Sequence, residues 1–214
     1  MAPGSRRRRP RDREAMAERA RSRIVDAAIM ALKREGFAGA SARTIAGIGG
    51  FSQSLIFYHF VSVNDLLLAA LDRTSALRME QYRQAVDETA SLPDLVGVAE
   101  RIFREDLDSG HITVLSEMIV GSSAEKELAP KVAARIEPWV RFTEETVTRI
   151  LSGSPLQAIV PARDLAFAIV SLYLGIELLT HLSGDRSRPD ALFAAASALT
   201  AGFGQLLRPT DARI

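Results

Sequence analysis

Several side chains in one short stretch of the chain have the types and spacing to bind nucleic acid. Gln53 carries a hydrogen-bond donor and an acceptor side by side, which matches the edge of an adenine in the major groove. Ser54 lies next to it, and Leu55 either meets a thymine methyl group or belongs to the core. Arg43 and Thr44 precede them at a spacing that suits phosphate contacts. The stretch therefore predicts DNA binding, with Gln53, Ser54 and Leu55 as candidates for base contacts.

Other kinds of chemistry find no support in the sequence. The three histidines, His59, His111 and His181, are far apart, and the chain has no cysteine, so we expect no metal site. The segment Gly47–Ser52 begins like a dinucleotide fingerprint but lacks its last glycine and a preceding strand. No paired-carboxylate motif, nucleophile elbow or nucleotide loop is present. We expect no catalytic residue, no cofactor and no enzymatic activity.

The candidate DNA-binding side chains are positioned by two short helices and the turn between them. Ser41 can cap the first helix, because its hydroxyl accepts a bond from a free amide of the first turn. Gly49 and Gly50 end that helix in a tight turn, and Ser52 can cap the second. A helix, a glycine turn and a second short helix form the arrangement that places a recognition helix in the major groove.

A longer helix should come before these two and complete a three-helix unit. It is expected from about Glu14 or Ala17 to Glu35, with apolar residues three and four apart from Ile24 to Leu32, and Gly36 ends it. The expected core residues of the two short helices are Ile45, Ile48, Leu55 and Phe60.

The order of residues in this unit also resembles a known family. The segment FSQSLIFYHF at Phe51–Phe60, followed by Ser62 and then Asp65–Leu67, resembles the DNA-binding domain of the TetR family of bacterial transcriptional regulators. Tyr58–Phe60 is the most specific part, and the resemblance extends from about Arg23 to Leu71. It implies phosphate contacts from Tyr58 and His59. The complete predicted DNA-binding set is Arg43, Thr44, Ser52, Gln53, Ser54, Leu55, Tyr58 and His59.

Charge is distributed unevenly along the chain. Residues 1–61 carry 12 Lys and Arg against 5 Asp and Glu, whereas residues 62–214 carry 15 against 21. A basic part that precedes an acidic part favours a nucleic-acid-binding domain joined to a domain of another kind. Residues 1–13 contain six arginines and should be disordered. Either they form a solvated tail, or they are an arm that contacts phosphates or the minor groove.

The sequence predicts an all-α fold of about nine helices. The expected divisions are a disordered basic arm at 1–13, a helix-turn-helix domain at 14–61, and a helical effector-binding and dimerisation domain at 62–214. The last domain opens with a connecting helix at 62–87, capped by Ser62. The further expected helices span about 93–107, 112–119 (ending at Gly121), 125–151 (kinked or broken at Pro138), 162–182 and 190–207.

The last two helices are unusually rich in apolar residues. The helix at 162–182 approaches the length of a membrane span, but it contains Glu177 and His181, so we expect a buried or interface helix instead. Two such helices suggest a homodimer in which each protomer gives two helices to a four-helix bundle, as the resemblance also implies. A two-fold dimer would present two recognition helices to an inverted-repeat operator on double-stranded DNA. The absence of cysteine is compatible with a reducing cytoplasm, where we expect the protein to be located, and we expect no membrane partner.

The resemblance further implies a pocket for a small effector among the middle helices. Candidate lining residues are Phe103, Met118, Trp139, Phe142, Phe167, Tyr173 and Glu177, with Glu117 and His181 as further polar anchors. The alternative is that these residues are ordinary core, and that Glu177 pairs across the dimer. A mostly apolar lining would suit a hydrophobic or amphipathic effector.

The sequence therefore predicts a DNA-binding transcriptional regulator, a repressor that a small, largely apolar effector releases from its operator. The alternative is a DNA-binding regulator or architectural protein that has no small-molecule effector. The release mechanism would be differential binding, in which the effector prefers the DNA-incompetent state of the dimer.

Overall fold

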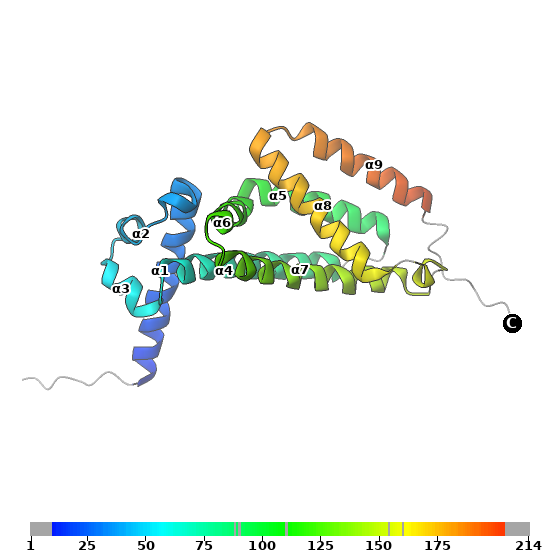
Figure 1. The fold of residues 1–214 in the computed structure, drawn as a ribbon. Coiled ribbons are helices and arrows are strands. Elements are labelled where there is room, and N and C mark those ends of the chain that lie inside the picture. The colour runs from blue at the N-terminus through cyan, green and yellow to red at the C-terminus, as the bar shows by residue number, and fades with distance from the viewer. Residues whose placement is uncertain are drawn as a thin grey trace, which may run out of the picture. The chain divides into compact units, whose positions relative to one another are not determined.

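The computed structural model describes residues 10–87, 89, 91–109, 111–153, 155–159 and 161–203. These residues form nine α-helices and one short 3₁₀ helix, with no strand among them, so the fold is all-α as predicted (Figure 1). The elements in chain order are α1 (Pro10–Gly39), α2 (Ala42–Gly49), α3 (Gln53–His59), α4 (Val63–Asp87), α5 (Leu92–Ser109), α6 (His111–Ala124), α7 (Leu128–Leu151), η1 (Pro155–Ala158), α8 (Ala162–Ser183) and α9 (Ser187–Phe203).

The chain divides into two compact units, Met1–Arg73 and Thr74–Ile214. The division falls inside α4, whereas the sequence-based limits assign that helix wholly to the second domain. Arg73 explains why the first turns of α4 belong to the N-terminal unit. Its guanidinium is 2.7 Å from the hydroxyl of Ser22 and 3.3 Å from the carboxylate of Asp26, both on α1.

Helix α1 supplies the apolar face on which the N-terminal unit is built. Ile24, Ala28 and Leu32 are completely buried, as their spacing predicts. Gly36 interrupts the regular helix with a positive φ of 68°, which a glycine adopts without steric cost. The helix begins at Pro10, earlier than expected, and so takes in the last four residues of the segment predicted to be disordered. Residues 1–9 of that segment lie outside the described part of the chain.

The turn between α2 and α3 depends on two adjacent glycines. Gly50 has a φ of 65°, in the left-handed region, and its amide bonds back to the carbonyl of Ala46. Gly49 leaves room for Phe51, because a Cβ atom added to Gly49 would lie 2.0 Å from the Phe51 ring. Ser41 caps α2 as predicted, since its hydroxyl accepts a bond of 3.2 Å from the amide of Thr44.

Two expectations for α3 need correction. Ser52 occupies the N-cap position with extended backbone, but its hydroxyl makes no capping bond to an amide. It pairs instead with the hydroxyl of Ser54 at 2.9 Å, a nearby partner of the same kind. The core residue of α3 is Ile56, which is completely buried, whereas Leu55 is only half-buried. Ile45 and Phe60 are buried as predicted, and Ile48 is half-buried.

The C-terminal unit is a bundle in which α7 packs along α8 and α5 packs along α9 (Figure 1). Helix α6 was expected to end at Gly121 but runs to Ala124; Gly121 is buried, and packing here outweighs its low helix propensity. Pro138 does not break α7, which continues to Leu151. Because proline has no amide hydrogen, Pro138 cannot donate the helical hydrogen bond to the carbonyl of Ala134. Ala134 is exposed, so water can donate to that carbonyl instead.

Candidate nucleic-acid interface and buried polar cluster

Helix α3 begins with a run of exposed polar side chains. Ser52, Gln53 and Ser54 are exposed at its start, so the Gln53 amide is available to a ligand. Ile56 is the residue of α3 that is completely buried in the core of the N-terminal unit, where α3 packs against α2. The arrangement fits a helix that enters the major groove.

The end of α3 carries two aromatic side chains with polar atoms. Tyr58 is 80% exposed, and its ring lies edge-on to the ring of His59 with 5.0 Å between the centroids. His59 is half-buried. The Tyr58 hydroxyl and a ring N–H of His59 are groups that can donate hydrogen bonds to phosphate oxygens at the edge of a DNA groove.

The predicted phosphate contacts of α2 differ in their availability. Arg43 is exposed and free to reach a phosphate. Thr44 is half-buried, and its hydroxyl lies 2.8 Å from the hydroxyl of Ser41. Thr44 is therefore better placed to support the helix start, with its backbone amide also held by Ser41.

Sequence reasoning missed two apolar residues on the same surface. Phe57 is more than half exposed and lies one helical turn after Gln53, and Val61, just beyond the helix, is 93% exposed. Apolar side chains at this position can contact the methyl group of thymine, which is the apolar part of a base edge in the major groove. In the sequence, the four-residue spacing between Gln53 and Phe57 indicates that the two side chains share one face of the helix.

Two arginines of α1 hold the turn and the end of α3 in place. Arg23 donates a hydrogen bond of 3.3 Å to the carbonyl of Gly49. Arg21 places its guanidinium 5.0 Å from the centroid of the Phe60 ring, a cation–π contact. These contacts fix the recognition helix on a rigid base within the N-terminal unit.

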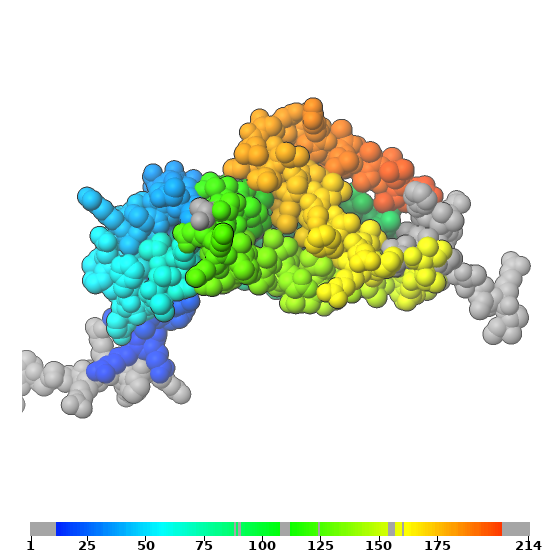
Figure 2. Space-filling view, viewed as in Figure 1, coloured from blue at the N-terminus to red at the C-terminus, as the bar shows by residue number. Residues whose placement is uncertain are grey.

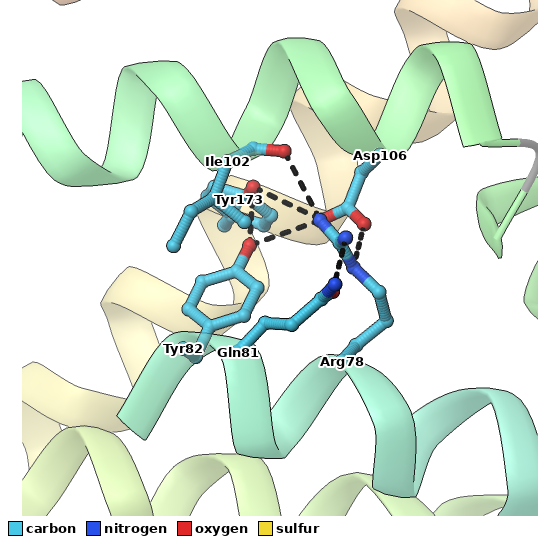
Figure 3. A network of polar contacts seen from close by, with 6 residues as sticks. All are labelled: Arg78, Gln81, Tyr82, Ile102, Asp106 and Tyr173. Carbon is cyan, nitrogen blue, oxygen red and sulfur yellow. Dashed lines mark hydrogen bonds and ion pairs between the residues drawn. The ribbon is translucent and has the colours of Figure 1, made fainter. Parts of the chain in front are cut away.

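A second site of interest lies inside the C-terminal unit, where polar side chains from three helices converge (Figure 3). Arg78 of α4 forms an ion pair with Asp106 of α5, and it also bonds Gln81 at 2.6 Å and the carbonyl of Ile102 at 3.3 Å. Tyr82 donates to the other oxygen of Asp106 at 3.1 Å. The hydroxyls of Tyr82 and Tyr173 bond each other, so the network connects α4, α5 and α8.

Glu177 of α8 completes this buried cluster. It is only 3% exposed. Burial raises the pKa of Glu177 well above its usual range, and the nearby Asp106 carboxylate raises it further. Burial also raises the pKa of Asp106, an effect that the Arg78 guanidinium partly offsets. Burial also raises the pKa values of Tyr82 and Tyr173; after burial, the largest further contribution comes from Tyr173 in the case of Tyr82 and from Glu177 in the case of Tyr173.

The residues predicted to line an effector pocket do not all meet at this cluster. Phe103 and Met118 are buried, and Trp139, Phe142 and Tyr173 are half-buried. Ring contacts join Trp139 to Tyr82 and Phe103 to Tyr173. Phe167 is 63% exposed on α8 and is not part of the buried set. Glu177 is buried within one chain, which does not favour the alternative in which it pairs across a dimer.

Arg78, Tyr82 and Asp106 have almost no local signal in the sequence. The first two are four residues apart on α4 and so share a face, which is the only local signal. Their partner Asp106 comes from another helix, and no pattern in the chain indicates that pairing. Among the described residues, no group of three or more His, Cys, Asp or Glu is arranged to hold a metal ion.

The exposed recognition helix and the helix-turn-helix that positions it define a DNA-binding transcriptional regulator. Residues 24–70 match the sequence model of the bacterial regulatory proteins of the tetR family. This match confirms that the N-terminal part of the chain carries the TetR-family DNA-binding domain that the sequence resembles. This is a family of regulators and not of enzymes. A comparison with curated proteins finds no match.

Solved structures share the whole fold at low sequence identity. A TetR-family regulator from Cytophaga hutchinsonii has a TM-score of 0.71 at 15% identity, over 87% of this chain and 96% of that one. FadR from Bacillus subtilis, solved in complex with stearoyl-CoA, has a TM-score of 0.68 at 15% identity, over 84% and 96%. The fatty acid degradation regulator FadR from Bacillus halodurans has a TM-score of 0.66 at 16% identity, over 91% and 96%. The likeness shows that both units belong to one common fold.

Proposed function

We propose that the protein is a repressor that binds an inverted-repeat operator as a homodimer and leaves it when a small effector enters the C-terminal unit. The observation that carries the DNA-binding half of the proposal is the exposed start of α3. Gln53 stands free on a helix that Ile56 fixes in the core. The set proposed to contact DNA is the predicted one, with Thr44 acting through its support of the start of α2 and with Phe57 added because it is exposed.

The homodimer part of the proposal rests on the exposed apolar face of α8. Leu165, Ile169, Leu172 and Leu179 are exposed and follow one another at spacings of four, three and seven residues, which places them on one stripe. Leu182 extends the stripe by a further turn. Helices α8 and α9 both lie at the surface of the C-terminal unit in the view of Figure 2. A second copy of the chain would cover this stripe.

Helix α8 is also long and apolar enough to cross a membrane, and only 22% of its most apolar window is buried in the chain. Glu177 argues against that role, because a buried carboxyl that is bonded within the bundle belongs to a packed helix. On α9, Leu192 and Leu199 are exposed seven residues apart, which adds an apolar stripe of matching spacing. Two stripes per protomer suit a four-helix dimer interface in a cytoplasmic protein.

The effector part of the proposal rests on the half-buried aromatic residues next to the buried cluster. Tyr82, Trp139 and Tyr173 are half-buried, and the Tyr82 ring contacts the rings of the other two. FadR from Bacillus subtilis was solved with stearoyl-CoA bound, which supports a small-molecule effector for a protein of this fold. An effector that binds one state of the dimer better would shift the DNA-binding equilibrium by its difference in affinity.

The experiment that tests this proposal is a reporter gene placed behind the operator, with and without the protein. Expression should fall when the protein is present and recover when a metabolite extract of the source cells is added to the transcription mixture. A duplex with the complete inverted repeat should bind two chains, whereas a single half-site should bind weakly. Unchanged or increased expression would contradict repression, and repression that no extract relieves would favour the regulator without an effector.

A further inference from the structure

Two carboxyl groups meet inside the C-terminal unit, where both are shielded from water. Asp106 of α5 is 2% exposed and Glu177 of α8 is 3% exposed. A hydrogen bond joins the two side chains. Two ionised carboxylates cannot form such a bond, because an ionised carboxylate only accepts hydrogen bonds. One of the two groups must therefore hold a proton in the folded protein.

The surroundings of the two groups assign this proton to Glu177. Asp106 forms an ion pair with the Arg78 guanidinium and accepts a bond from the Tyr82 hydroxyl (Figure 3). Burial raises the pKa of Asp106, and these two contacts lower it. Glu177 has no such support, since its Oε1 atom is buried without a hydrogen-bond partner in the described part of the chain. An unpartnered oxygen costs less free energy in a neutral acid than in a carboxylate.

The charges that act on Glu177 come from two neighbouring helices. Burial and the Asp106 carboxylate of α5 raise the pKa of Glu177, and the Arg78 guanidinium of α4 partly offsets them. The cluster thus holds two carboxyl groups and one guanidinium. With both carboxyls ionised it would carry an uncompensated negative charge in the interior, which is costly.

The other titratable groups near Glu177 leave this balance unchanged. Tyr82 of α4 and Tyr173 of α8 are bonded to each other, and burial raises the pKa of both, so they remain neutral. Helices α6 and α7 also pack against α8. Each carries a half-buried carboxyl, Glu117 and Glu144 respectively, and neither is among the groups that shift the pKa of Glu177.

We propose that the two carboxyls form a proton-dependent lock, in which a proton on Glu177 bonds α8 to Asp106 of α5 and, through the ion pair, to Arg78 of α4. In alkaline solution the O–H bond of Glu177 breaks, and its proton combines with hydroxide to form water. Two carboxylates then face a single guanidinium, so the bond between α8 and α5 is lost and the like charges repel. Helix α8 is therefore held at neutral pH and released when the proton leaves.

Release of α8 would also reach the proposed homodimer. Glu177 occurs between Leu172 and Leu179, which belong to the exposed stripe of the same helix. Alkaline solution should therefore dissociate the dimer, as measured by sedimentation equilibrium. Glu177→Gln keeps a hydrogen-bond donor and has no proton to lose in this range, so this variant should stay dimeric. This consequence rests on the proposed function, whereas the lock itself does not.

Infrared spectroscopy of the full-length protein tests the lock directly. A protonated carboxyl has a C=O stretching band that is separate from the bands of ionised carboxylates. We expect one such band at neutral pH, which disappears as the pH is raised and is absent from Glu177→Gln. Asp164→Asn, which removes an exposed carboxylate of α8, should keep the band. An unmodified protein without the band at neutral pH would overturn the proposal.

The pH dependence of unfolding provides an independent measurement. The folded protein keeps the Glu177 proton, whereas the unfolded chain releases it above about pH 4.3. The stability from this proton is complete below that pH and is lost as the pH rises through the raised pKa of Glu177. Within this interval, the unfolding constant from urea denaturation should grow by about tenfold per pH unit relative to that of Glu177→Gln. Equal slopes in the two proteins would contradict the lock.

The remaining outcomes separate the lock from the proposed function. If Glu177→Gln fails to fold, the infrared titration of the unmodified protein still decides whether a buried carboxyl holds a proton. A band that persists in a folded Glu177→Gln variant would assign the proton to another group and overturn the proposal. A dimer that survives after the band has been lost would refute the link to the homodimer. A protein that is monomeric at every pH would contradict the proposed homodimer, while the band and the unfolding slope would still test the lock.

Discussion

Arg78 and Asp106 form an ion pair whose side chains are only 9% and 3% exposed. The pair joins α4 to α5 inside the C-terminal unit, and Tyr82 and Gln81 satisfy further polar atoms of the two partners. Helix α4 is also the element that continues into the N-terminal unit, where Arg73 bonds to α1. This buried charge pair therefore helps to fix α4 against α5 in the C-terminal unit.

Replacing Asp106 by alanine should strongly destabilise the protein. The Arg78 charge would remain buried without its counter-charge, and breaking such a pair costs about 3–5 kcal/mol of unfolding free energy. Urea denaturation followed by circular dichroism measures the loss. The control is Arg104→Ala, which breaks contacts to Glu100 and Asp190 that lie at the surface, and it should have a much smaller effect. Equal effects of the two changes would contradict the importance of the buried pair.

The glycine turn of the helix-turn-helix offers a matched pair of substitutions. Gly49→Ala should lower the unfolding free energy by about 1–3 kcal/mol, because the new methyl group would collide with the Phe51 ring. Gly47→Ala meets no atom within 4 Å and should stabilise α2 by up to about 1 kcal/mol, since alanine favours a helix. Thermal unfolding of both variants checks the prediction. A stable Gly49→Ala variant would show that Phe51 moves aside freely.

Gln53→Ala should change which bases the protein prefers in its operator. The side chain is exposed at the start of α3 and has the hydrogen-bonding groups to pair with an adenine edge. Selection from a random DNA library should show relaxed preference at one position of each half-site, at a cost of about 1–3 kcal/mol for the best sequence. Arg43→Ala should instead weaken binding to all sequences alike and reduce the salt dependence. An unchanged base preference in Gln53→Ala would refute the assignment.

Leu172→Glu or Leu179→Glu should convert the proposed homodimer into monomers. Each change places a charge in the exposed apolar stripe of α8, where a second copy of the chain would have to bury it. Sedimentation equilibrium at several concentrations measures the mass. Val120→Glu is the matched control, because Val120 is an exposed apolar residue of α6 outside the stripe. A dimer that persists in both α8 variants would place the interface elsewhere.

The fold was largely predictable because its local signals agree with one another. Ser41 and Ser62 cap their helices as expected, with bonds of 3.2 Å and 3.1 Å from amides three residues on. The glycine at position 50 adopts the left-handed turn that its place after α2 suggests. These features depend on neighbours in the chain, which a sequence displays directly.

The errors share a different cause, since they depend on surroundings that a sequence does not display. Ser52 has a second hydroxyl within reach and bonds to that instead of capping α3. Pro138 stays inside α7 because the carbonyl that it leaves unpaired belongs to an exposed residue. The pairing of Arg78 with Asp106 joins two helices, so the buried cluster could not be predicted from spacing.

The most direct test of the central claim is selection of DNA fragments from the source genome by the purified protein near physiological salt. We predict recovery of one or a few fragments that share an inverted repeat, with half-sites separated by about one helical turn, roughly 34–36 Å. That result would establish a sequence-specific dimeric regulator. Recovery of bulk DNA without preference, or of no DNA at all, would contradict the claim that α3 reads a specific operator.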